Sequence, residues 1–153
     1  MIQTKGKGFI VSAPSGAGKT TLANALLNRY DCFAFSVSAT TRAPRSYEEH
    51  GKHYYFLSEE DFRARISQNT FLEYEEVYPG RFYGTLRTEV DRILRQGLYP
   101  IFDVDVVGGL NIKKQFGDMA VSIFIQPPTK EALKARLQGR ASDSEAEIEK
   151  RYQ

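Results

Sequence analysis

The segment Ala13–Thr20, with the sequence APSGAGKT, constrains the fold more than any other part of the chain. It follows Gly8–Ala13, a short run of β-branched and aromatic side chains that is typical of a buried strand. It leads into Gly18–Tyr30, where leucine and alanine recur at helical spacing. A strand, a glycine-rich turn and a helix in this order begin a βαβ unit, so the sequence predicts an α/β fold.

The spacing of this segment is that of a Walker A loop. In such a loop, successive backbone N–H groups surround the phosphates and the following helix presents its positive N-terminal end. We expect Lys19 to reach the β and γ phosphates and the Thr20 hydroxyl to bind Mg²⁺. Ala13 replaces the first glycine of the motif, at a position that closes the turn and need not touch phosphate. The alternative interpretation is a glycine turn beside a solvated lysine.

Composition narrows the choice of partners. The chain has 153 residues, enough for one domain, and its 21 basic and 19 acidic residues leave a net charge of +2. This balance argues against a general polyanion binder, so we expect no nucleic-acid partner. The single Cys32, expected as a small buried side chain, excludes an internal disulfide and a structural zinc site. Without an apolar run of roughly 18–20 residues or a leader-like start, we expect a cytoplasmic protein with no membrane partner.

The remaining pattern alternates between strands and helices. Thr129 is expected to cap the last of these helices, near the end of the core. Alternation of this kind predicts a mostly parallel sheet with helices on both faces. The predicted elements are strands at Phe33–Ser38, Tyr99–Asp103 and Ala120–Gln126, a weak helix at Val106–Gln115 and a helix from Thr129 to about Gln138.

The middle third interrupts this series. Thr40–Lys52 has no apolar periodicity, Tyr54–Phe56 resumes a strand, and Ser58 begins a helix to about Gln68 with Asp61 in a capping box. Two further strands flank a turn at Pro79–Gly80. We interpret residues 36–96 as an inserted α+β subdomain in a core of about 1–35 and 97–128, followed by a lid region at about 129–153.

Several polar residues point to a second anion site only when they are considered together. Arg42 and Arg45 flank Pro44, which keeps the segment out of a helix, but alone they are typical of a solvated turn. Acidic residues such as Glu73 usually lie on the wet face of a strand, and tyrosines at the rim of a core. Asp103 is a stronger candidate because it ends an apolar strand, where carboxylates face the ligand crevice of open α/β sheets.

The sequence strongly resembles the guanylate kinase family. The matching stretches, in order along nearly the whole chain, are SAPSGAGKTTL, SVSATTRAPR, GKHYYF, the Phe-Leu-Glu at 71–73, FYGT, DVDVVGG and KEALKARLQGR. The resemblance implies an enzyme of purine nucleotide metabolism that transfers the ATP γ-phosphoryl group to GMP, and to dGMP, with Mg²⁺. It also implies a P-loop NTPase-type parallel sheet, a GMP-binding insertion and a mobile lid.

The resemblance further implies roles for individual residues. Asp103 is similar to the carboxylate near Mg²⁺ and its water shell, and the implied catalytic residues are Lys19, Arg42, Asp103 and Arg136. The implied ATP site comprises Ser15, Gly16, Ala17, Gly18, Lys19, Thr20, Thr21, Arg136 and Arg140, with Arg151 as a further lid cation. The implied GMP site comprises Arg42, Arg45, Tyr54 and Tyr83 around the phosphate, Glu73, Ser38 and Thr85 at the guanine, and Asp105 as another substrate-contacting carboxylate.

Some features depart from the family pattern and leave other functions open. Val107 replaces a common glutamine, Ala141-Ser142 replaces the usual Gly-Thr, and family members continue beyond Gln153 into a further strand and helix. We therefore expect the 153 residues to be part of a longer chain. The competing functions are a non-catalytic peptide-binding module, which typically has a degraded phosphate loop, and a kinase for another phosphorylated acceptor such as a ribose phosphate.

Overall fold

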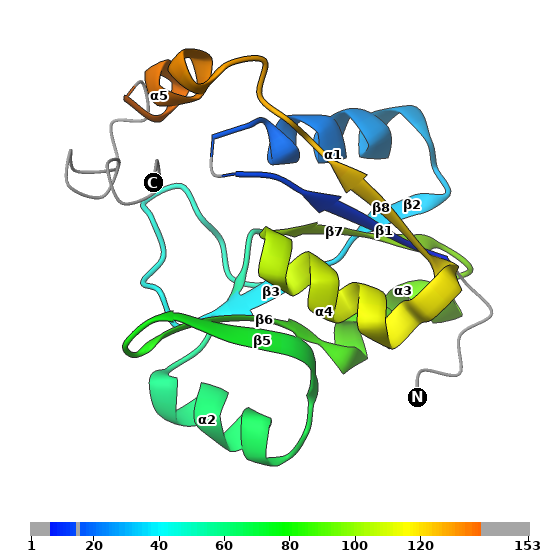
Figure 1. Ribbon diagram of the computed structural model, residues 1–153. Helices are drawn as coiled ribbons and strands as arrows, with labels where there is room; N and C mark the ends of the chain where they lie inside the picture. Colours follow the sequence, from blue (N-terminus) through cyan, green and yellow to red (C-terminus); the bar gives the residue numbers. More distant parts are fainter. Residues whose placement is uncertain (1–6, 15, 139–153) are drawn as a thin grey trace.

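A parallel sheet forms the core of the computed structural model, which describes residues 7–14 and 16–138 (Figure 1). Its strands pair side by side in the order β2-β7-β1-β8, and every pairing is parallel. This confirms the parallel sheet expected from the alternating pattern. The strands are β1 (Gly8–Ser12), β2 (Phe33–Phe35), β7 (Tyr99–Val104) and β8 (Ala120–Phe124).

Helices cover both faces of this sheet, as Figure 1 shows. On one face, Ile101 of β7 packs with Val11 and with Ala23 of α1 (Lys19–Arg29). The next residue of β7, Phe102, points to the other face and packs against α3 (Arg87–Arg95) and α4 (Val106–Phe116). Successive side chains of a strand alternate between faces, so a strand covered on both sides is apolar throughout. The predicted fold class is thereby confirmed.

A second, mixed sheet is formed by residues inserted between β2 and β7. Its order is β4-β3-β6-β5, in which β3 pairs parallel with β4 and antiparallel with β6. Strands β5 and β6 form a hairpin, and α2 (Glu59–Ser67) packs on the sheet through Phe62, whose ring stacks on two other phenylalanine rings at 4.3 and 5.1 Å. The strands are β3 (Ser38–Thr40), β4 (Tyr55–Phe56), β5 (Phe71–Tyr78) and β6 (Arg81–Leu86).

Two predicted helix starts are confirmed by their caps. The Ser58 hydroxyl accepts a hydrogen bond from the Asp61 backbone N–H at 3.0 Å and donates to the Asp61 carboxylate at 2.7 Å. Thr129 accepts from the Ala132 N–H at 3.0 Å at the start of α5 (Lys130–Gln138). These caps satisfy N–H groups that a helix leaves unpaired in its first turn.

The expected strand Phe33–Ser38 is wrong, because the chain divides there between the two sheets. Strand β2 ends at Phe35 and β3 begins at Ser38. Between them, the Ser36 N–H donates to the Ile101 carbonyl of the first sheet at 3.0 Å, and the Val37 N–H donates to the Glu89 carboxylate at 3.2 Å. The two sheets are therefore joined here by only two residues.

Helix α3 lies outside every expectation from the sequence. It follows β6 without a loop and buries Val90 and Ile93 together with the carboxylate of Glu89, which is 3% exposed. Glu89 accepts hydrogen bonds from the Tyr55 hydroxyl at 3.1 Å and from Arg92 at 2.8 Å, in addition to the Val37 N–H. Helix α3 thus ties the first sheet to the second where they meet.

The rest of the described chain adds little to the site. A short 3-10 turn at Gly117–Met119 leads from α4 into β8. Cys32, expected to be buried, is exposed. Among residues 7–14 and 16–138, helices are all too short or too polar to cross a membrane.

Candidate functional site

A cleft of about 480 Å³ has walls from both sheets. One wall carries the phosphate loop, the starts of α1 and α4 and the end of β7, and the other carries β3, β5, β6 and the loop after β3. The residues predicted from the sequence that line it are Gly16, Gly18, Lys19, Thr20, Ser38, Arg42, Arg45, Tyr54, Glu73, Tyr83, Asp103 and Asp105.

The phosphate-loop wall is made largely of backbone. Gly16 and Gly18 have φ angles of 86° and 102°, in the left-handed region that favours glycine. Gly18 occupies the N-cap of α1 and has no side chain to bond the first-turn N–H groups. Those N–H groups and the helix dipole make the start of α1 a place for an anion.

Two side chains of this wall form hydrogen bonds with other segments, one with the start of the phosphate loop and one with β7. The Lys19 ammonium donates to the Ala13 carbonyl at 3.1 Å, and the Thr20 hydroxyl donates to the Asp103 carboxylate at 2.7 Å. Asp103 reaches this position because β7 pairs with β1, opposite Val11. The hydroxyl and the carboxylate are hard oxygen donors of the kind Mg²⁺ prefers. Within the described residues no cluster of three histidine, cysteine or acidic side chains could hold a metal by itself.

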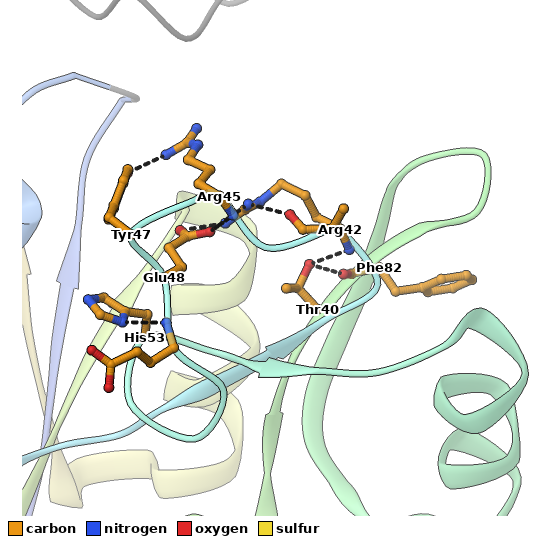
Figure 2. A network of polar contacts seen from close by, with 9 residues as sticks. Thr40, Arg42, Arg45, Tyr47, Glu48, His53 and Phe82 are labelled. Carbon is orange, nitrogen blue, oxygen red and sulfur yellow. Dashed lines mark hydrogen bonds and ion pairs between the residues drawn. The ribbon is translucent and has the colours of Figure 1, made fainter.

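The opposite wall includes the loop between β3 and β4 that carries Arg42 and Arg45, here called the arginine loop. The side chain of Arg42 is only 15% exposed, so it is not part of a solvated turn. It forms an ion pair of 2.8 Å with Glu48, and its guanidinium carbon lies 5.3 Å from the centre of the Tyr54 ring. The hydrogen bond with Glu48 raises the pKa of Arg42 above its usual value, against the effect of burial. Arg45 is exposed and donates to the Tyr47 hydroxyl at 3.2 Å (Figure 2).

Further along this wall, Glu73 lies on β5. Its carboxylate accepts a hydrogen bond of 2.7 Å from the Thr85 hydroxyl of β6. Burial raises the pKa of Glu73 to about 7; the bond from Thr85 opposes this rise, and the nearby carboxylates of Asp105 and Glu75 add to it. Thr85 is 1% exposed and does not line the cleft, so its hydroxyl contacts the Glu73 carboxylate and is not open to a ligand.

Two tyrosines line the same wall near Arg42. The rings of Tyr54 and Tyr83 are 6.2 Å apart and meet edge to face. Burial raises the pKa of Tyr54 to about 12, so at neutral pH its phenol is protonated and available as a donor. Neither tyrosine is fully buried, and both line the cleft rather than filling a core.

Asp105 has a structural role that its sequence position did not indicate. It is the N-cap of α4, where one carboxylate oxygen accepts from the Gly108 N–H at 2.7 Å. Its carboxyl group also approaches Glu75 of β5. Burial and the neighbouring Asp105 raise the pKa of Glu75, and one buried oxygen of Glu75 has no hydrogen-bond partner.

The other predicted residues are not brought into the cleft or are not described. Ala17 and Thr21 are absent from its lining, although both belong to the phosphate-loop region. Arg136 lies on α5, but its side chain is not described, and Ser15, Arg140 and Arg151 lie outside the described residues.

Sequence reasoning also missed several lining residues. Glu75 and Arg81 share a face with Glu73 and Tyr83, because side chains two residues apart along a strand point the same way. This two-residue period in β5 and β6 was the available signal. No comparable pattern marked Glu48, whose position depends on the loop conformation. The lining residues that were not predicted are Glu48, Glu75, Val77, Tyr78, Arg81, Gly84, Val104 and Gly108.

Comparison with known proteins shows which family this chain resembles. The family model described as guanylate kinase matches residues 5–153. The guanylate kinase of Bacteroides thetaiotaomicron is 54% identical over 147 residues, which cover 96% of this chain and 72% of the relative. That of Porphyromonas gingivalis is 54% identical over 144 residues, covering 94% of this chain and 77% of the relative.

A solved structure agrees with these sequences. The crystal structure of guanylate kinase from Anaplasma phagocytophilum matches with a TM-score of 0.73 and 35% identity, over 91% of this chain and 70% of that one. The likeness therefore extends over most of this chain. With a family match over nearly its whole length, the chain belongs to the guanylate kinase family.

Proposed function

We propose that this protein transfers the γ-phosphoryl group of ATP to GMP, forming ADP and GDP. One observation carries the proposal: a single cleft holds a phosphate loop on one wall and, on the other, an arginine pair beside a carboxylate suited to guanine. Family membership supports the same reaction. An intact phosphate loop, with Gly16, Gly18, Lys19 and Thr20 all lining the cleft, argues against a non-catalytic binding module.

On the donor side, we assign the triphosphate to the loop and the start of α1. The backbone N–H groups bind the phosphates, and Lys19 leaves the Ala13 carbonyl to contact the β and γ phosphates. Thr20 and Asp103 would hold Mg²⁺, the carboxylate through a water molecule. The metal supplies neutralisation of charge on the phosphate oxygens.

On the acceptor side, we assign the GMP phosphate to Arg42, Arg45, Tyr54 and Tyr83. The acceptor is a phosphate monoester with a second pKa near 6, so it is mostly a dianion at neutral pH and needs no general base. The reaction instead needs two polyanions to be brought in line. Arginine suits this task because its planar fork of donors matches phosphate oxygens in pairs.

At the far end of the cleft, we assign the guanine to Glu73 and Ser38. Thr85 uses one acceptor site of one Glu73 oxygen, so the carboxylate keeps an acceptor site on each oxygen for the two adjacent donors on the guanine edge. Adenine lacks this pair of donors and would leave the half-buried carboxylate without a partner from the base. A mismatch of this kind discriminates by about 10⁴–10⁵ in favourable cases. This arrangement favours a base over a bare ribose phosphate as the acceptor.

A coupled assay on the full-length protein tests the proposal directly. ADP formation is measured with ATP, Mg²⁺ and, in turn, GMP, dGMP, AMP, CMP and UMP. We expect kcat/KM to be highest for GMP and activity to disappear when Mg²⁺ is chelated. Faster turnover with a non-guanine monophosphate would refute the assignment of Glu73, and ATP binding without any turnover would refute the reaction. Arg136 and Arg140 as lid cations, and a cytoplasmic location, stay predictions from the sequence.

A further inference from the structure

Glu48 is a cleft-lining carboxylate to which neither the sequence nor the proposed chemistry gives a role. It lies in the loop between β3 and β4, and its side chain is only 5% exposed. An acidic group beside a site for a phosphate dianion repels the ligand, because like charges at close range destabilise one another. Its presence in the wall of the cleft therefore requires an explanation.

Figure 2 shows that this single carboxylate contacts both arginines of the loop. The two oxygens of Glu48 accept from Nη1 and Nη2 of Arg42 at 2.9 and 2.8 Å. One of them also accepts from the backbone N–H of Arg45 at 2.7 Å. The Glu48 N–H donates back to the Arg45 carbonyl at 3.0 Å, which closes the turn. The Glu48 carboxylate therefore holds Arg42 through the Arg42 side chain and Arg45 through the Arg45 backbone N–H.

The bonds to Arg42 determine which edge of its guanidinium is available. Arginine has five N–H donors in a rigid plane. Nη1 donates to Glu48 and, at 2.8 Å, to the Ala43 carbonyl, and Nη2 gives one N–H to Glu48. These bonds leave the N–H of Nε and the second N–H of Nη2, which lie side by side on one edge, and the Tyr83 side chain lies within hydrogen-bonding reach of the guanidinium. Such a pair of N–H groups fits two oxygens of one phosphate.

The remaining contacts hold Arg42 in the same orientation. Its backbone N–H donates at 3.2 Å to the Thr40 hydroxyl, which donates at 2.9 Å to the Phe82 carbonyl of β6. Its guanidinium lies near the rings of Tyr54 and Phe56, at 5.3 and 5.8 Å from their centres. The hydrogen bond from Arg42 lowers the pKa of Glu48, against the effect of burial, so Glu48 is ionised at neutral pH.

We propose that Glu48 is a positioning residue of the acceptor-phosphate site: by binding the guanidinium of Arg42 and the backbone N–H of Arg45, it presents the Nε–Nη2 edge of Arg42 and the side chain of Arg45 to a single phosphate. The proposal rests on the proposed function, because the phosphate in question is that of GMP. Glu48 does not touch the reacting atoms. It removes the need for the arginines to find their orientation when the ligand binds, and preorganisation of this kind favours binding.

The test is the variant Glu48→Gln, assayed with GMP and ATP varied separately. The amide keeps the shape and one acceptor oxygen, but it cannot accept the paired bonds from Arg42. We expect KM for GMP to rise about tenfold, the loss of one charge-assisted hydrogen bond, with KM for ATP unchanged. The matched control is Glu49→Gln, whose exposed carboxylate pairs with Lys52 outside the cleft and whose loss should change neither constant.

The outcomes separate this inference from the function on which it rests. An unchanged KM for GMP in Glu48→Gln would overturn the positioning role, and so would a lower KM, since it would mean that the carboxylate only repels phosphate. Failure of the wild-type protein to phosphorylate GMP would refute the proposed function instead. A rise in both KM values, with a lower melting temperature, would indicate a merely structural role and would also overturn the proposal.

A second variant covers the case in which Glu48→Gln does not fold. Glu48→Asp keeps the negative charge but is one methylene too short to reach Arg42 and the Arg45 N–H together. Positioning predicts a raised KM for GMP with KM for ATP unchanged, whereas a purely electrostatic role predicts wild-type values for both. A double-mutant cycle with Arg42→Lys completes the test: we expect the two effects on GMP to be non-additive, and additive effects would contradict a role through Arg42.

Discussion

The two walls of the cleft, to which we assign the two phosphate groups, are built by different physical means. The loop wall relies on backbone: glycines in left-handed conformations, the N-terminus of α1 and one lysine. The opposite wall relies on side chains from separate segments, held by one another, with Arg42 paired to Glu48 and Glu73 bonded to Thr85. A backbone site follows from a contiguous motif, whereas a side-chain site requires the tertiary fold before it exists.

This contrast predicts that single changes affect different kinetic constants on the two walls. The largest effect is expected for Lys19→Met, which removes the positive charge that we assign to the transferred phosphoryl group. We expect kcat to fall about 10²–10³-fold, the range for losing one electrostatic contact to a transition state, with GMP affinity nearly unchanged. Kinetics with GMP binding measured separately check this. Lys52→Met, at an exposed lysine outside the cleft, is the control.

Next in size is Arg42→Lys on the opposite wall. Lysine keeps the charge but cannot form paired bonds to Glu48 on one edge and to phosphate on the other. We expect kcat/KM for GMP to fall about 10²-fold, or roughly 2.7 kcal/mol, with KM for ATP unchanged. Arg65→Lys, at an exposed position on α2, should behave as wild type. A loss divided equally between the two substrates would mean that the walls do not act separately.

Glu73→Gln addresses selection of the base rather than binding of phosphate. We expect the preference for GMP over AMP to fall about 10- to 100-fold, since an amide has only one oxygen that accepts hydrogen bonds where a carboxylate has two. ATP binding should change less. Parallel assays with GMP and AMP give the ratio, and Glu60→Gln, at an exposed position on α2, is the control. Equal weakening of both substrates would remove Glu73 from the guanine site.

The raised pKa of Glu73 also makes this end of the cleft sensitive to pH. Guanine requires the ionised carboxylate, so KM for GMP should fall as pH rises through about 7. For stability the sign is opposite: a carboxyl whose pKa is higher in the folded state binds more protons there, so stability falls as pH rises from about 4.5 to 7. Glu73→Gln should abolish this loss of stability. Unfolding midpoints and KM values between pH 5 and 8 measure both trends.

The smallest expected effect is that of Glu75→Ala. The charge of Glu75 contributes to the raised pKa of Glu73, after burial and Asp105. Its removal should move the pH dependence of KM for GMP to lower pH, with little change in kcat. A titration of KM against pH in both proteins checks the direction. A midpoint that stays where it was would show that the charge of Glu75 does not affect the pKa of Glu73.

The sequence predicted what depends on local pattern. The phosphate loop, strands β1 and β7, and the caps at Ser58 and Thr129 all have signals within a few residues. The break between β2 and β3 was missed because an apolar run does not reveal that its two halves join different sheets. Helix α3 was missed because it follows β6 directly, with Leu86 at its N-cap where a capping side chain would mark a start.

The residues of the candidate site show the same difference between what a local sequence pattern predicts and what depends on the tertiary fold. Arg42, Glu73 and Tyr83 could be named from the family resemblance, but their partners could not. Glu48 is six residues from Arg42 in the sequence and meets it only because the loop turns back at Arg45. Thr85 was expected to contact the base, yet its register opposite Glu73 buries it and turns its hydroxyl to the carboxylate.

The bond between Glu89 and the Val37 N–H fixes the chain at the point where it leaves the first sheet for the second. If one sheet rotated against the other about this hinge point, the displacement of a residue would grow with its distance from the hinge. Ser38 and Thr85, which pair with each other next to the hinge, would hardly move, while the tip of the β5–β6 hairpin at Gly80 would move farthest. Closure of the cleft would then leave base selection nearly unchanged and alter chiefly the distance between the two phosphates.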